Sequence, residues 1–185
     1  MVIHLLFNLR VNMRFLAISV LTVASLAATT LERLSMDQMI SQSTFVVRGR
    51  IQSGAGMLSG RTIYTKYSLQ VLEILKGSAT PAMDVLVPGG STNGLSQAVA
   101  GAPRLQAGAE MVLFLWKSPK GLIHVIGMQQ GAFDLQKSSS GEQFISRNAI
   151  SDATVLDRTT LVPQTDTGFR MSLSELRRRM GVVKE

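Results

Sequence analysis

Cysteine is absent from the 185 residues of this chain. Disulfide bonds, thiolate metal sites, cysteine nucleophiles and lipoprotein attachment are therefore excluded, and the stability of the fold must come from packing alone. Histidine is scarce, with only His4 and His124. If His4 leaves with a leader, one imidazole remains, which cannot furnish a zinc site with two histidines. His124 shares a strand face with Leu122 and Ile126, a pattern typical of a partly buried structural histidine.

Nucleotide-binding motifs are missing as well, although the stretch VPGGSTNGLS at 87–96 holds three glycines in ten positions. A Walker-type loop needs a lysine after its glycines, and none lies between Lys76 and Lys117. The spacing of the glycines also fails the G-x-G-x-x-G fingerprint. The stretch therefore predicts a connection between two strands and no nucleotide cofactor.

Catalytic constellations are equally hard to find. The G-x-S-x-G elbow of serine hydrolases does not occur, and "DATVLD" lacks the oxygen-rich loop of a calcium site. Four carboxylates are expected at strand edges or turns, where nothing in the sequence pairs them: Glu73, Asp84, Glu110 and Asp134. We therefore predict no catalytic, metal or cofactor residues, and keep as an alternative a hydrolase whose site is assembled only in three dimensions.

The chain does contain one long uncharged segment, FLAISVLTVASLAA at 15–28, preceded by Arg10 and Arg14. This is the plan of a secretory signal peptide, with cleavage after Ala27. Residues 1–27 are thus the predicted leader, and Met13 is an alternative start. The mature protein is expected in the periplasm or outside the cell, while an uncleaved leader would anchor it facing the periplasm.

Strand signals dominate the chain beyond this leader. The stretch 31–42 has apolar residues near helical spacing and predicts a short helix. STFVVRGRI alternates as a half-buried strand does, with Gly49 at a bend or close approach. SGAGMLSGR at 53–61 is expected to be a flexible turn region. In TIYTKYSLQVLEILKG the apolar positions change face around Glu73, with Leu72 and Ile74 on the other face, which predicts a β-bulge or a sharp coil of the strand.

Further strands are expected at MDVLV, LIHVIGM, GAFDLQK and EQFIS, and AEMVLFLW at 109–116 is continuous enough to be buried on both sides. Residues 31–147 are therefore predicted to form one β-barrel domain with a leading helix. Residues 148–185 are expected to be an irregular tail ending in a helix, with capping-box spacing at Ser172 and Glu175.

Without Arg10 and Arg14, 17 basic residues face 12 acidic ones, a net charge of about +5. This favours acidic partners, such as envelope polymers. Specific nucleic-acid binding is not expected, because only RRR at 177–179 clusters and no aromatic platform accompanies it. The connection 88–108 is long enough to be functional. We name Gly89, Gly90, Asn93 and Arg104 as possible ligand or partner contacts.

Several of these stretches together resemble a family of small exported bacterial β-rich proteins of uncharacterised function. The resemblance covers roughly residues 35–137, through FVVRGRI, GRTIYTKYSLQVLEILKG, VLVPGG, VAGAPRLQAGAEMVLFLW and HVIGMQQGAFDL. The order of these strands is more distantly similar to netrin-like modules, the OB-type barrel of tissue inhibitors of metalloproteinases. Those inhibitors rely on an N-terminal cysteine and disulfides, so the resemblance implies only a small, closed or partly open antiparallel barrel.

The sequence thus predicts a mainly β, OB-like barrel that is exported and acts as a non-catalytic binding or interaction module. Its partner is expected to be a protein or an acidic envelope polymer. Membrane contact is expected only through an uncleaved leader. A purely structural envelope component, suggested by the basic segment SELRRRMGVVKE, is a further alternative.

Overall fold

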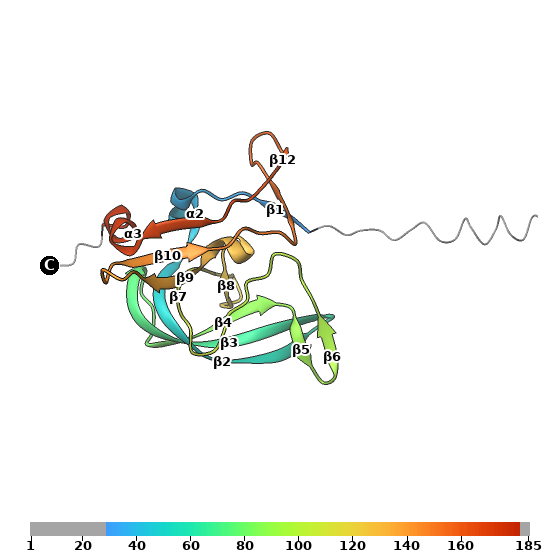
Figure 1. Ribbon diagram of the computed structural model, residues 1–185. Helices are drawn as coiled ribbons and strands as arrows, with labels where there is room; N and C mark the ends of the chain where they lie inside the picture. Colours follow the sequence, from blue (N-terminus) through green and yellow to red (C-terminus); the bar gives the residue numbers. More distant parts are fainter. Residues whose placement is uncertain (1–28, 182–185) are drawn as a thin grey trace, which may run out of the picture.

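The structure is a computed structural model that describes residues 29–181 (Figure 1). In this part of the chain the fold is mainly β with two short helices, as predicted for the fold class. The predicted leader at 1–27 lies outside the described residues, and so do its alternatives of cleavage and anchoring. Within 29–181, no helix combines the length and the apolar character needed to cross a membrane.

The elements follow one another in this order: β1 (Thr30–Glu32), α2 (Met36–Gln42), β2 (Phe45–Ser59), β3 (Thr62–Lys76), β4 (Ala82–Pro88), β5 (Gly90–Thr92), β6 (Leu95–Gln97), β7 (Glu110–Lys117), β8 (Ile123–Val125), the 3-10 helix η1 (Met128–Gly131), β9 (Ala132–Lys137), β10 (Gln143–Arg147), β11 (Thr154–Leu156), β12 (Pro163–Gln164), β13 (Phe169–Ser172) and α3 (Leu173–Arg179).

Five strands form a ring in the order β7, β2, β3, β4, β8, and β8 pairs again with β7. All neighbours in the ring are antiparallel except β4 and β8, which run parallel and share the single registered pair Leu86 and His124. The ring is therefore only partly closed. Strands β9, β10 and β13 extend the same sheet beyond β7.

The ring can close because one edge of β7 serves two partners. Its C-terminal half, Leu115 to Lys117, pairs with β8, and its N-terminal half, Met111 to Leu113, pairs with β9. Between them the chain turns through η1, where Gly127 adopts a φ of 58°. Because the chain turns between β8 and β9, β8 can pair with β4 while β9 extends the sheet along β7.

The long hairpin of β2 and β3 differs from the sequence prediction. The expected flexible turn at 53–61 is wrong, because β2 continues to Ser59 and pairs with β3 up to Thr62. Only Gly60 and Arg61 form the turn. The glycines that suggested flexibility instead allow close approach: a Cβ on Gly56 would stand 1.9 Å from the carbonyl oxygen of Ser91 in β5.

The predicted change of face in β3 is confirmed as a β-bulge. Val71 pairs with Gly49 while Glu73 pairs with Arg48, which leaves Leu72 as the extra residue. The bulge turns Glu73 and the buried Leu75 away from the barrel interior. Leu72 and Ile74, the residues that the sequence pattern assigned to the other face, are 38% and 42% exposed.

Two hydrophobic cores lie on opposite sides of the sheet. One fills the ring, and its buried members include Val47, Leu69 and Leu113. The other lies between the sheet and the two helices, and includes Phe114, Phe133 and Leu176. Strand β7 supplies both cores in alternation, so the prediction that it is buried on both faces is confirmed. Strand β2 is also covered on both faces at its start, since Val46 is fully buried.

Helix α2 is tied to the end of β3 by one side chain. Lys76 Nζ donates to the carbonyl oxygens of Ile40, Ser41 and Ser43 at the C-terminus of the helix. A cation at this position also complements the helix dipole. Ser35 begins the helix by accepting from the N–H of Gln38.

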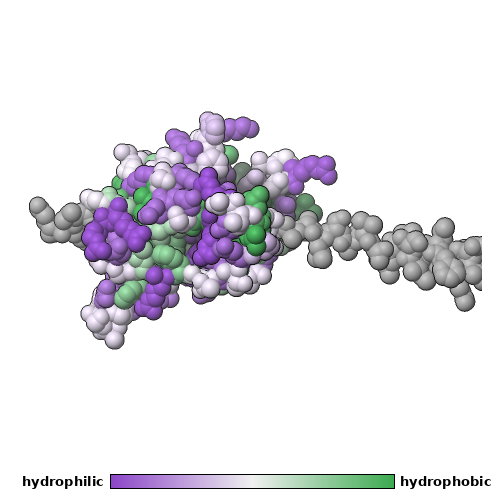
Figure 2. Space-filling model, turned by 90° about the horizontal axis from the view of Figure 1, so that it is seen from above, coloured by the Kyte–Doolittle hydropathy of each residue, from purple (hydrophilic) through white to green (hydrophobic). Residues whose placement is uncertain are grey.

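The segment after Arg147 differs from the expected irregular tail. Strand β11 pairs with β1, β13 pairs with β10 in the main sheet, and Leu173 and Leu176 of α3 are buried in the second core. The segment is thus part of the same body (Figure 1). The face carrying α2, α3 and β12 shows separate hydrophobic areas among hydrophilic ones (Figure 2).

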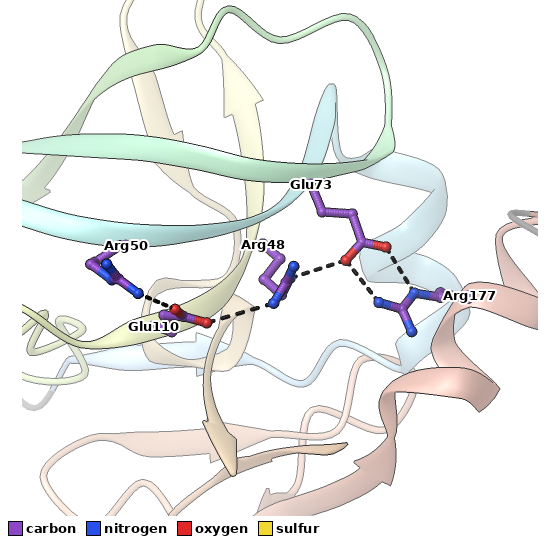
Figure 3. Close-up of polar contacts among 5 residues, drawn as sticks. All are labelled: Arg48, Arg50, Glu73, Glu110 and Arg177. Carbon is purple, nitrogen blue, oxygen red and sulfur yellow. Dashed lines mark hydrogen bonds and ion pairs between the residues drawn. The ribbon is translucent and has the colours of Figure 1, made fainter. Parts of the chain in front are cut away.

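A row of alternating charges joins α3 to the barrel (Figure 3). Glu110 pairs with Arg50 and Arg48, Arg48 pairs with Glu73 at 3.0 Å, and Arg177 of α3 donates twice to Glu73 at 2.8 Å. Hydrogen bonding to Glu73 raises the pKa of Arg177. Because the side chains of Glu73 and Arg177 are each only 15% exposed, solvent screens this pair weakly.

Glu73→Gln is expected to lower the free energy of unfolding by about 1.5–3 kcal/mol, the range for a hydrogen bond to a charged group. The substitution keeps the shape of the side chain but withdraws the charge between two arginines. Urea unfolding measures the change. The matched control is Glu175→Gln, whose partners Arg178 and Arg179 are 78% and 39% exposed, and it should leave stability nearly unchanged. Equal losses in the two variants would contradict the expectation.

Candidate functional site

Two hollows flank the segment Pro103–Leu105, which leads from the β5–β6 hairpin toward β7. One has a volume of about 540 Å³ and the other about 690 Å³. Pro103, Arg104 and Asp152 line both of them. We call the pair the Arg104 site. It lies beside the barrel, where this segment passes over the ends of the strands.

The larger hollow brings together three of the four predicted contact residues, since Gly89, Gly90 and Arg104 all line it. Both glycines have positive φ values, 93° and 124°. A Cβ on Gly90 would stand 2.2 Å from Thr65 Oγ1, which itself donates to the carbonyl oxygen of Gly89 at 2.8 Å. The glycines therefore serve the close approach of this turn to β3.

Asn93, the fourth predicted residue, does not reach the site. It is exposed at the tip of the β5–β6 hairpin, where Asn93 and Gly94 both have positive φ. Asn-Gly is the preferred pair for a two-residue hairpin turn of this kind. The Asn93-Gly94 dipeptide is therefore a sequence signal for a hairpin within the connection 88–108. The role of Asn93 is to form this turn.

The smaller hollow is polar and contains charges of both signs. Arg104, Asp134, Arg147 and Asp152 all line it. Asp152 accepts from the N–H of Gly101 at 3.0 Å, which links the connection to the segment before β11. Arg104 is exposed, and within residues 29–181 it has no hydrogen bond or ion pair. Its guanidinium is thus open to a ligand.

Arg147 has a different role, because its charge is used within the protein. It forms a bidentate pair with Asp166, whose carboxylate also accepts from the N–H of Ile150 at 2.8 Å. Burial is the largest influence on the pKa of Asp166 and raises it, but the hydrogen bonds from Arg147 and Ile150 and the nearby positive charge outweigh it. The net pKa lies below its ordinary value. Arg147 itself lines the hollow, and its pairing with Asp166 holds residues 147–150 in place.

The chemistry available here is recognition more than catalysis. Two carboxylates, Asp134 and Asp152, line one hollow, so the hydrolase alternative retains a candidate pair. Neither is buried, and His124 lies outside both hollows. Among residues 29–181, no three acidic or histidine side chains are grouped so that they could hold a metal ion.

Sequence reasoning found Arg104 but missed Asp152 and Arg147. Arg104 stood out as the only charge between Asp84 and Glu110. Asp152 belongs to the part expected to be an irregular tail, and Arg147 is the last residue of the predicted barrel domain. Their approach depends on the pairing of β1 with β11 and of β10 with β13. No local pattern in the sequence announces those contacts.

Comparisons with known proteins add no relative. No family model, curated protein or solved structure matches this chain.

Proposed function

We propose that this protein is an exported, non-catalytic binding module whose Arg104 site takes an acidic ligand. The observation that carries the proposal is the position of Arg104, an exposed arginine without an internal partner in the described chain, at the junction of two hollows. An arginine presents a planar fork of donors that matches a carboxylate or phosphate. Two adjoining hollows suit successive units of an acidic polymer in the cell envelope, or an acidic segment of a protein.

We propose further that the partly closed ring is OB-like, in keeping with the resemblance to netrin-like modules and to the family of small exported proteins. OB folds are partly open, five-stranded Greek-key barrels that bind ligands through loops and one face. The ring here has five strands. The last of them along the chain, β8, closes the ring by pairing with both β7 and β4. A barrel of this size is filled by side chains, so ligands meet its outside.

The alternative of a structural envelope component rested on the arginine run at 177–179. Each of these arginines has an acidic partner: Arg177 pairs with Glu73, Arg178 with Glu175, and Arg179 with Glu175 and Asp37. The run is therefore largely neutralised within the fold, and Arg104 is the better candidate for contact with an acidic partner.

Arg104→Glu should weaken binding to an acidic polymer by at least tenfold, because a charge-assisted hydrogen bond is worth about 1.5–3 kcal/mol and each 1.4 kcal/mol is a factor of ten. Biolayer interferometry against polygalacturonate and polyglutamate, with neutral dextran as the blank, measures this loss. The stronger polyanion identifies the source of the ligand as a glycan or a protein.

Arg61→Glu is the matched control. Arg61 is exposed at the β2–β3 turn, lies outside both hollows and undergoes the same change of charge. It should reduce binding only through the overall field, which salt screens. If both variants lose affinity equally, or if neither polyanion binds the wild type, the proposal fails.

A further inference from the structure

Three aromatic side chains form a row on the outside of the ring. Trp116 of β7 stacks on His124 of β8, with ring centroids 5.2 Å apart and planes 28° apart, and Tyr64 of β3 lies 6.5 Å beyond His124. The three rings line a cleft of about 340 Å³, which we call the aromatic cleft. The remaining lining residues are Leu86, Val87, Pro88, Pro103, Val125 and Met128.

The exposure of Trp116 is unusual for its position. Five consecutive residues before it in β7, from Met111 to Leu115, are 4% exposed or less, whereas Trp116 is 38% exposed. Tryptophan combines a large apolar face with one polar N–H, and it contributes most to binding when a ring or an apolar group covers that face. Its position beside a cleft points to a ligand.

The hydrogen bond of His124 determines what its ring can do. Nδ1 lies 3.2 Å from the carbonyl oxygen of Leu86. A carbonyl only accepts, so Nδ1 carries the proton and Nε2 of the neutral ring is an acceptor. Within the described chain, neither Nε2, the hydroxyl of Tyr64 nor the N–H of Trp116 has a hydrogen-bond partner. The cleft thus offers apolar ring faces together with unused donors and an acceptor.

The absence of charged residues from the lining of the cleft limits the class of ligand that it can bind. No lysine, arginine, aspartate or glutamate lines the aromatic cleft. Single-stranded nucleic acid also stacks on aromatic rings, but it requires a basic groove along its phosphates. A proline-rich peptide would cover the rings, yet it has few hydroxyl donors for an imidazole acceptor. A sugar ring is neutral, has an apolar face and carries hydroxyl groups around its edge.

We propose that the aromatic cleft binds a neutral oligosaccharide, with one pyranose ring against the face of Trp116 and a hydroxyl group donating to His124 Nε2. Pro103 also lines both hollows of the Arg104 site, so the two sites adjoin. The proposal does not depend on acidic ligands at Arg104, because different residues carry it.

Fluorescence titration tests this directly, since Trp116 is the only tryptophan in the chain. Cellohexaose, maltohexaose and chitohexaose are the probes. At least one should change the emission of Trp116 saturably, while a polyproline peptide and poly(dT) should not. The proposal would be overturned if only polyproline or poly(dT) changed the emission saturably. It would also be overturned if none of the five probes did so.

Two variants separate binding from folding, with affinity measured by calorimetry. Trp116→Ala removes the stacking face and should weaken binding by roughly five- to 150-fold, taking the range known for one nucleobase stacked on an aromatic side chain as the guide. His124→Phe keeps an aromatic ring but removes the acceptor, and should weaken binding about tenfold. Arg61→Glu, at the exposed β2–β3 turn and outside the aromatic cleft and both hollows, should bind the sugar as the wild type does. Unchanged affinity in both cleft variants, with unchanged thermal unfolding, would contradict the assignment.

Discussion

Asp166→Asn is expected to lower the free energy of unfolding by about 3–5 kcal/mol, the cost of breaking a buried ion pair by removing one partner. The side chain of Asp166 is 3% exposed and that of Arg147 is 10% exposed. An asparagine would turn an amide N–H₂ toward the guanidinium and leave the charge of Arg147 without compensation. Urea unfolding followed by circular dichroism measures the loss.

The control removes both charges together. Arg147→Met with Asp166→Leu should lose less stability than Asp166→Asn, because well-packed apolar residues often replace a buried pair at little cost. The loss that remains is that of the acceptor for the N–H of Ile150. Arg147 Nε is buried without a partner in the described chain, so the double variant also removes an unsatisfied donor. A loss below about 1 kcal/mol for Asp166→Asn would show that the charge of Arg147 is solvated after all.

The same pair predicts a dependence on pH. The pKa of Asp166 is lowered in the folded protein, so its contribution to stability is fully present above the ordinary pKa of about 3.9 and is lost as the pH falls through the folded value. Wild-type stability should therefore decline below about pH 4. Asp166→Asn should show a shallower decline over that window, since the group that binds the proton is gone.

Gly49→Val is expected to destabilise the protein by about 3 kcal/mol, at the upper end of the range for overpacking. A Cβ on Gly49 would stand 2.6 Å from the carbonyl oxygen of Gln70 and 2.7 Å from Leu69 Cδ1. Gly49 pairs with Val71 directly beside the bulge at Leu72. A backbone carbonyl cannot rotate away as a side chain can, so either β2 or β3 must shift. Such a shift would disturb the hydrogen-bonded register of the hairpin.

Gly54→Val is the matched control in the same strand. There a Cβ would meet the ring of Tyr67 at 2.7 Å, and a ring on a half-buried side chain can rotate away. Valine also favours strands over glycine. Thermal unfolding of the two variants compares them, and Gly54→Val should cost clearly less than Gly49→Val. The reverse order would show that the approach of β2 to Gln70 does not limit the packing.

Much of the sheet could be predicted from local pattern. The uninterrupted apolar run at 111–115 required burial on both faces, and the change of phase in 62–76 required a bulge, because side chains alternate strictly along a strand. Gly49 was correctly placed at a close approach. Other local signals were misread: glycines at 54 and 56 suggested a turn, but pairing with β3 and contact with β5 hold them in a strand.

The sequence by itself determined that this protein is mainly β and lacks cysteine chemistry, because composition and a period of two need no partner to be interpreted. Only the tertiary structure decided which residues meet. Arg104 and Asp152 are 48 positions apart in the sequence, and Trp116 and Tyr64 come to lie against the same residue, His124, only through the pairing of β8 with β7 and β4. Such contacts depend on how the ring closes, and ring closure depends on the packing of all its strands together, which no local pattern encodes.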